Sequence, residues 1–100
     1  MRDYLFLMHD DTTQLSGEAG LDWAHYLARL REAGVLQGGS AIGAGLCARK
    51  SDPPPAVTKH LTGFIRIAAA NLVDAQAWLA GNPVYEAGGT VEIRELPRTD

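Results

Sequence analysis

The sequence predicts an α+β domain of the ferredoxin-like kind, in which one antiparallel sheet carries two helices on the same face. A strand at residues 3–9 is apolar on both sides, and an amphipathic helix follows at residues 22–33. Near the end of the chain, a strand at residues 60–68, a helix at 72–80 and a strand at 89–96 succeed one another. With further strands between these parts, the expected order is β-α-β-β-β-α-β.

The first strand places alternate side chains on opposite sides of the sheet. Leu5 and Leu7 point one way, and Tyr4, Phe6 and Met8 point the other. Because both sides are apolar, we expect both sides of this strand to be covered, as in the middle of a sheet.

The first helix, Asp22 to Ala33, is expected to begin with Asp22 as its N-cap and to end at Gly34 in a left-handed conformation. His25 lies off its apolar stripe. The stripe consists of Trp23, Tyr26, Leu27 and Leu30.

The middle of the chain reads as a strand at residues 35–42 that is interrupted by Gly38-Gly39. A phosphate-binding loop would need these glycines to lead into a helix, so a bulge in the strand is the better interpretation. A short strand is expected at residues 46–50. Residues 51–55 (SDPPP) predict an exposed loop, since proline has no N–H to donate.

The second helix is expected to be capped by Asn71 and stopped by Gly81, with Pro83 preventing its resumption. The strands on either side alternate, so each has a face toward the helices. The predicted helix-facing side chains are Leu61, Ile65, Ile67, Val91 and Ile93.

The other face of the sheet is partly apolar, through Phe64, Leu96 and one side of the first strand. This is too much apolar surface to leave in water, so we expect a homodimer that packs sheet against sheet. The same face carries charged groups that would look into one cleft.

This cleft is the candidate site for a small molecule. In an enzyme, His60 would move a proton and Glu92 would orient its imidazole. An anion would be held by Arg66 or Arg94, whose guanidinium groups match a carboxylate. Further candidate ligand contacts are Phe64, His9 and Tyr85. The alternative interpretation is a set of Arg–Glu pairs that serve only strand register and dimer specificity.

Length and composition set limits on function. One hundred residues are expected to form one domain over residues 1–100, and the net charge of −3 argues against a nucleic-acid or membrane-surface partner. The single Cys47 excludes an intramolecular disulfide, and no cofactor is expected. His9, His25 and His60 lack metal-ligand spacing, so no metal site is predicted. With no membrane span or cleavage signature at the N-terminus, we expect a cytoplasmic protein.

Three stretches carry a family resemblance: GVLQGG at 34–39, HLTGFIRI at 60–67 and NPVYEAGGTVEIRELP at 82–97. They resemble the YCII-related family, especially its branch with the DGPF-type domain. The resemblance implies a dimeric α+β barrel fold and a cytoplasmic bacterial protein. It also implies relatives in the wider superfamily that act on small aromatic or halogenated molecules.

The resemblance further implies a dyad of a helix histidine and the aspartate of an Asp-Pro turn, and this chain departs from both. Asn82-Pro83 stands at the turn, and the helix position lies nearer Trp23 than His25. The DGPF tetrapeptide is replaced by SDPPP. An amide cannot act as a base, which favours a small-molecule binding module. A small lyase or isomerase that uses His60, and a purely structural dimerisation domain, are the alternatives.

Overall fold

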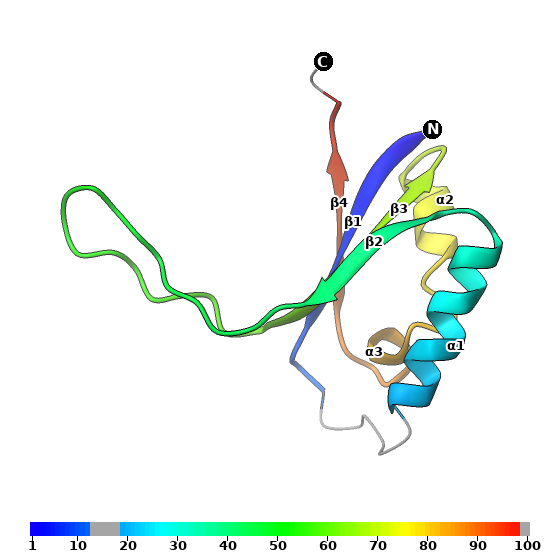
Figure 1. Cartoon of the computed structure of the whole chain (residues 1–100), viewed down its shortest axis with the longest axis horizontal. Helices are drawn as coiled ribbons and strands as arrows, with labels where there is room; N and C mark the ends of the chain where they lie inside the picture. The colour runs from blue at the N-terminus through cyan, green and yellow to red at the C-terminus, as the bar shows by residue number, and fades with distance from the viewer. Residues whose placement is uncertain (13–18, 99–100) are drawn as a thin grey trace.

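The computed structural model describes residues 1–12 and 19–98, and within these residues it has four strands and three helices (Figure 1). In chain order they are β1 Arg2–His9, α1 Ala19–Glu32, β2 Leu36–Ala41, β3 Leu61–Ala69, α2 Leu72–Ala77, α3 Pro83–Glu86 and β4 Val91–Leu96.

The strands form one antiparallel sheet in the order β2-β3-β1-β4. All described helices lie on one face of this sheet (Figure 1). The α+β, ferredoxin-like fold class is therefore confirmed. The face without helices is called the open face below.

The core lies between the sheet and the helices. From β1 it takes Tyr4, Phe6 and Met8, each at most 3% exposed. Leu5 and Leu7 point to the open face and are only half-buried, so one side of β1 is left without a covering layer in the single chain. The predicted helix-facing side chains Ile65 and Ile67 are buried, and other members of the core are Leu30, Val35, Ala69, Ala75, Leu79 and Val84.

Helix α1 presents the predicted apolar stripe to the sheet, with Tyr26 and Leu30 buried in the core. It begins at Ala19, so the prediction of Asp22 as its N-cap was wrong, and Asp22 lies in the first turn instead. There its negative charge favours the helix N-terminus without capping it. Gly34 ends the helix with φ of 75°, as expected.

The Gly38-Gly39 segment forms the predicted irregularity in β2. The register against β3 shifts between Leu36 and Gly38. A Cβ at Gly39 would lie 2.6 Å from the carbonyl oxygen of Phe64, which is closer than any real Cβ contact. Glycine is needed here because the two backbones approach each other too closely for a side chain.

Residues 42–60, called the arm below, connect β2 to β3 as a long hairpin-like loop that projects away from the body (Figure 1). The predicted strand at residues 46–50 was wrong. The limb of the arm opposite residues 46–50 contains Pro53 to Pro55, which have no N–H to donate to a neighbouring strand. The radius of gyration of 15.0 Å exceeds the roughly 13 Å of a compact domain of this length, as a projecting arm requires.

The second helical region differs from the prediction at its end. Asn71 caps α2 by accepting a bond from the Asp74 N–H at 2.9 Å, as expected. The helix stops at Ala77, however, and the Asn82-Pro83 pair starts a further short helix, α3, which the sequence did not predict. Proline at the first helical position lacks only an N–H that would have no helical partner anyway.

Candidate functional site

The register of the sheet places the predicted site residues in rows across the open face. Strand β1 lies between β3 and β4, so Leu7 is flanked by Phe64 and Glu92. One pleat further along, Leu5 is flanked by Arg66 and Arg94. The predicted site residues on β3 and β4 therefore all lie on the open face; they are Phe64, Arg66, Glu92 and Arg94.

At the end of these rows, four side chains form what we call the open-face cluster: His9, His60, Glu92 and Arg94. The His9 Nε2 atom lies 3.0 Å from Glu92 Oε1. Arg94 donates to Glu92 Oε2 at 3.1 Å. The ring of His60 meets the ring of His9 edge to face, with centroids 4.8 Å apart.

Both partners favour the ionised form of Glu92. The hydrogen bond from Arg94, and after it the one from His9, hold the pKa of Glu92 below its usual value. Glu92 thus stays a carboxylate that orients the His9 ring. The sequence reasoning had paired Glu92 with His60, but the side chain in hydrogen-bond contact is His9, because β1 rather than the start of β3 neighbours β4.

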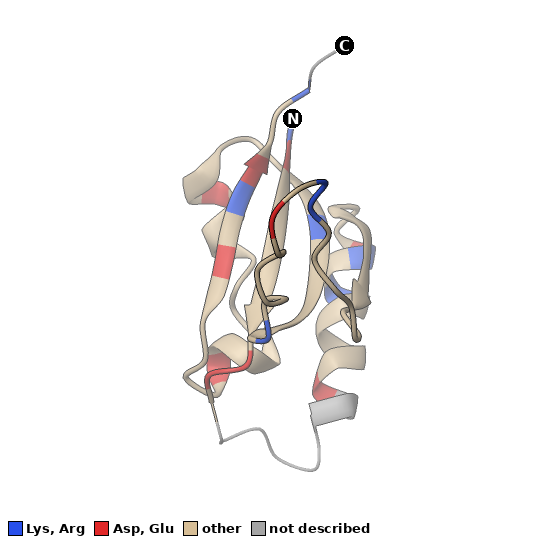
Figure 2. Cartoon of the chain, turned by 90° about the vertical axis from the view of Figure 1, so that its left-hand side faces the viewer, with Lys and Arg blue, Asp and Glu red and all other residues tan. Residues whose placement is uncertain are grey.

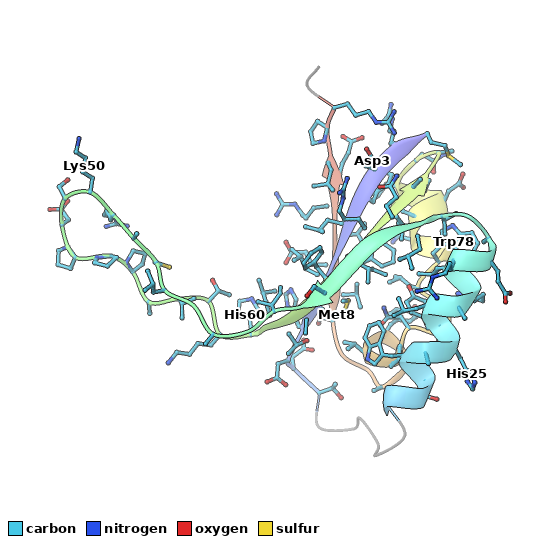
Figure 3. All side chains as sticks on the ribbon, in the orientation of Figure 1. Asp3, Met8, His25, Lys50, His60 and Trp78 are labelled. Carbon is cyan, nitrogen blue, oxygen red and sulfur yellow. The ribbon has the colours of Figure 1, made fainter. Side chains whose placement is uncertain are left out.

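Tyr85 is not brought to this cluster. It lies on α3, on the helix side of the sheet, with 48% of its surface exposed. His60 sits at the base of the arm, and His25 points outward from α1 (Figure 3).

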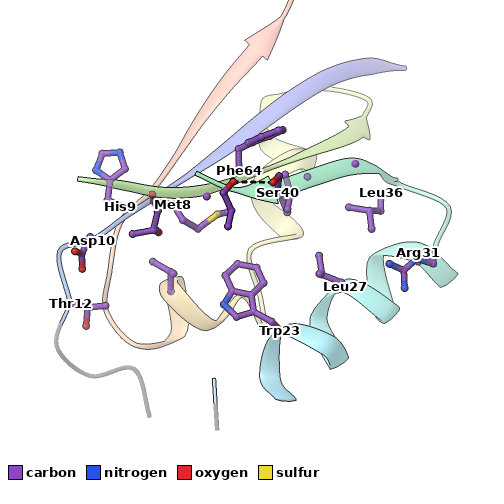
Figure 4. Close-up of a pocket in the computed structure, with 17 residues that line it drawn as sticks. Met8, His9, Asp10, Thr12, Trp23, Leu27, Arg31, Leu36, Ser40 and Phe64 are labelled. Carbon is purple, nitrogen blue, oxygen red and sulfur yellow. Dashed lines mark hydrogen bonds between the residues drawn. The ribbon is translucent and has the colours of Figure 1, made fainter. Parts of the chain in front are cut away.

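A cavity of about 630 Å³ lies on the opposite side of the sheet, between α1 and the ends of β1, β2 and β3. We call it the helix-side cavity. Trp23 and Leu27 of α1 project into it toward the strands, whereas the ring of His9 points to the other side (Figure 4). The lining comprises Met8, His9, Asp10, Thr12, Trp23, Leu27, Arg31, Leu36, Gly38, Gly39, Ser40, Ala41, Thr62, Gly63, Phe64, Ile65 and Val84.

The sequence reasoning missed this cavity. Trp23 and Leu27 were assigned to the stripe that packs in the core or at a dimer interface. The available signal was the Gly38-Gly39 pair opposite that stripe, because a strand without side chains leaves space under a helix. The cavity forms where these glycines and Gly63 line the sheet.

Asn82, which precedes Pro83 at the start of α3, is fully buried. Its Oδ1 accepts bonds from the N–H groups of Val84 at 3.0 Å and Tyr85 at 3.1 Å, which caps α3. Its Nδ2 has no hydrogen-bond partner among the described residues. Burial raises the pKa of the neighbouring Tyr26 hydroxyl, and the Asn82 side chain acts in the opposite direction.

The Tyr26 hydroxyl donates to the carbonyl oxygen of Trp78 at 2.7 Å, which joins α1 to the end of α2. Arg29 donates to the Ala80 carbonyl oxygen beside it. These contacts fix the part of α1 that carries Trp23.

Within residues 1–12 and 19–98, no group of three or more His, Cys, Asp or Glu side chains is arranged to hold a metal ion. No helix in the same part of the chain is both long enough and apolar enough to cross a bilayer.

The family model of the YCII-related domain matches residues 2–99. The chain therefore belongs to the YCII-related family. Among solved structures, it is similar to 5-chloro-2-hydroxyhydroquinone dehydrochlorinase from Burkholderia phenoliruptrix AC1100, solved in complex with 2,5-dihydroxybenzoquinone. The TM-score is 0.57 at 17% identity, over 97% of this chain and 95% of that one. At this identity the likeness supports the fold alone. No curated protein matches the sequence.

Proposed function

We propose that this YCII-related protein binds a small aromatic anion in the helix-side cavity. The observation that carries the proposal is the cavity itself, whose 630 Å³ falls within the roughly 300–1,000 Å³ of small-molecule sites. Its walls are mostly apolar, and a few polar groups converge on it, as such sites require.

Two side chains determine the ligand class. Trp23 offers a flat apolar surface on which a ring can stack. Arg31 lines the same cavity, and its guanidinium group makes no ion pair or hydrogen bond with the described residues. A guanidinium group without a partner suits a carboxylate or phenolate. The dehydrochlorinase of similar fold is named for an oxygenated aromatic substrate, which guides the choice of probes.

The experiment is a titration of the isotopically labelled protein with benzoate and with 2,5-dihydroxybenzoquinone, followed by amide and indole NMR shifts. Cyclohexanecarboxylate and benzamide are the matched probes that lack the ring or the charge. We expect saturable shifts at the Trp23 indole, Gly39 and Gly63, weaker for each matched probe. Shifts confined to the open face, or equal binding of all four probes, would refute the proposal.

A charge test on the protein side completes the design. Arg31→Gln should weaken benzoate binding about 10-fold or more, the effect of losing a charge-assisted hydrogen bond. Arg66→Gln is the matched control, because it removes the same charge from the open face. Equal losses in the two variants would mean that only net charge matters.

An acid/base enzyme is the second candidate, because the 3.0 Å contact between His9 and Glu92 is the arrangement that orients a histidine for proton transfer. It replaces His60 by His9 as the residue in hydrogen-bond contact with the carboxylate. Hydrogen–deuterium exchange at the ring carbons of 2,5-dihydroxybenzoquinone, lost in His9→Gln, would support this candidate. Exchange that is unchanged by His9→Gln would remove it.

We also propose that the protein is a homodimer joined through the open face. The half-buried apolar side chains on this face are Leu5, Leu7, Phe64 and Leu96. A two-fold contact between two such faces buries them on both copies at once. Light scattering should give twice the chain mass of 10.7 kDa, and Phe64→Glu should give the monomer mass. A monomeric wild-type protein would refute the dimer.

A further inference from the structure

We infer that the arm of one copy reaches over the open-face cluster of a second copy, so that the cleft around this cluster is built from two chains. The inference rests on the proposed homodimer and adds the part that the arm plays in it. It is independent of the ligand proposed for the helix-side cavity.

The direction of the arm is the first argument. The arm leaves the sheet on the side away from the helices (Figure 1), and it stands in front of the open face when that face is viewed directly (Figure 2). Any protein that packs against the open face therefore contacts the arm. A second copy that stacks there by a two-fold axis meets one arm and offers its own in return.

The surface of the arm is the second argument. Leu46 is 81% exposed and Ile42 is 37% exposed, so apolar side chains stand in water on a segment with no core of its own. The side-chain hydrogen bonds within the arm run between its two limbs, from Cys47 to the Ala56 carbonyl and from Arg49 to the Pro53 carbonyl. A covering partner would bury what the chain itself leaves exposed.

The stiffness of the arm is the third argument. Pro53 to Pro55 hold one limb in an extended form, and Asp52 makes the turn at the tip with φ of 67°. Aspartate tolerates this left-handed conformation better than most residues do. A segment already held in its bound shape loses little conformational entropy when it docks.

Charge selects a second copy as the occupant. The arm contains three basic residues (Arg49, Lys50 and Lys59) and one acidic residue (Asp52), for a net charge of +2. The remaining chain holds six basic and eleven acidic residues, for a net charge of −5. The opposite net charges favour a second copy of this chain as the body over which the arm lies.

The arm would change the cleft by shielding it from water. The His9–Glu92 pair is only partly buried in the single chain, with side-chain exposures of 18% and 37%. A second chain lying over it lowers the local dielectric and strengthens both the pair and any anion held by Arg66 and Arg94. The open-face site is thus incomplete without the partner's arm.

Paramagnetic relaxation measured between copies tests this arrangement. In a Cys47→Ser background, a spin label is attached at Lys50→Cys, at the arm tip (Figure 3). This spin-labelled protein, at natural isotope abundance, is mixed with ¹⁵N-labelled protein that carries no spin label. We expect broadening of the amide signals of Leu7, Phe64 and Glu92. The matched control carries the label at Val73→Cys, 73% exposed on α2, and should leave these signals sharp.

The outcomes separate the two proposals. Broadening on the open face from the arm label supports the exchanged arm. A dimer by light scattering without that broadening, or with broadening only on the helices, refutes the arm and leaves the dimer. A monomer refutes both. A variant with residues 44–58 replaced by Asn-Gly should form a weaker dimer and still bind benzoate in the helix-side cavity. A dimer of unchanged affinity would refute the docking of the arm on the second copy.

Discussion

Asn82 is the clearest place to test how the helix layer is held together. Its side chain is fully buried, and its Oδ1 accepts bonds from both the Val84 and the Tyr85 N–H groups. Replacing Asn82 by alanine leaves two N–H groups at the start of α3 without an acceptor. Because Asn82 and Val84 are both buried, solvent does not readily replace the lost oxygen at the Val84 N–H.

The expected cost follows from these contacts. Loss of an N-cap costs about 0.5–2 kcal/mol, and a buried donor without a partner costs about 1–3 kcal/mol. With the two effects partly overlapping, we expect Asn82→Ala to lower the free energy of unfolding by about 2–4 kcal/mol. For a domain of this size that corresponds to a fall in Tm of roughly 10–25 °C.

Asn71 provides the matched control, because it caps α2 by the same chemistry at an exposed position. It makes a single bond to the Asp74 N–H at 2.9 Å, and water can replace it. Asn71→Ala should cost about 0.5–1 kcal/mol.

Urea unfolding of both variants, followed by tryptophan fluorescence, measures the difference. The reasoning fails if Asn82→Ala costs no more than Asn71→Ala, since burial would then add nothing to the cap.

Two further predictions concern the edges of the sheet. Thr90 donates to Asp11 through its hydroxyl at 2.5 Å and its N–H at 2.8 Å, and these bonds lower the pKa of Asp11. The resulting stability is present above the usual pKa of 3.8 and is lost as the pH falls through the lowered pKa. The urea midpoints of wild type and Asp11→Asn should therefore converge as the pH is lowered below 3.8, and a gap that stays constant with pH contradicts this. Gly39→Ala should cost about 1–3 kcal/mol in thermal melts, because its Cβ would meet the Phe64 carbonyl. Gly43→Ala, with open space around it, should change stability by less than about 0.5 kcal/mol, and equal effects would refute the close approach.

The sequence was sufficient for those elements whose local pattern and packing agree. The alternation of β3 predicts the burial of Ile65 and Ile67, the stripe of α1 predicts the burial of Tyr26 and Leu30, and the Gly38-Gly39 bulge follows from the lack of a side chain. Local rules failed where long-range contacts decide. The segment at 46–50 has strand-like composition, but the opposite limb of the arm contains Pro53 to Pro55, which have no N–H with which to form a ladder.

The start of α3 shows the same limit. Pro83 was taken as a signal against helix, although at a first helical position it favours one. Which role it takes depends on Asn82 being buried and able to cap, and that depends on tertiary packing. The partner of Glu92 was misassigned for a related reason: the strand order is a long-range property, and it makes β1 the neighbour of β4, so that His9 rather than His60 contacts the carboxylate.

The orientation of His9 bears directly on whether the helix-side cavity is a binding site or a catalytic one. His9 lines the cavity, yet its Nε2 is engaged by Glu92, and the ring lies on the side of the sheet away from Trp23 (Figure 4). A ligand stacked on Trp23 is thus separated from the imidazole by the strand that carries it. The imidazole is thus not directed at the stacked ring, and proton transfer by His9 inside the cavity would require the His9–Glu92 contact to break first.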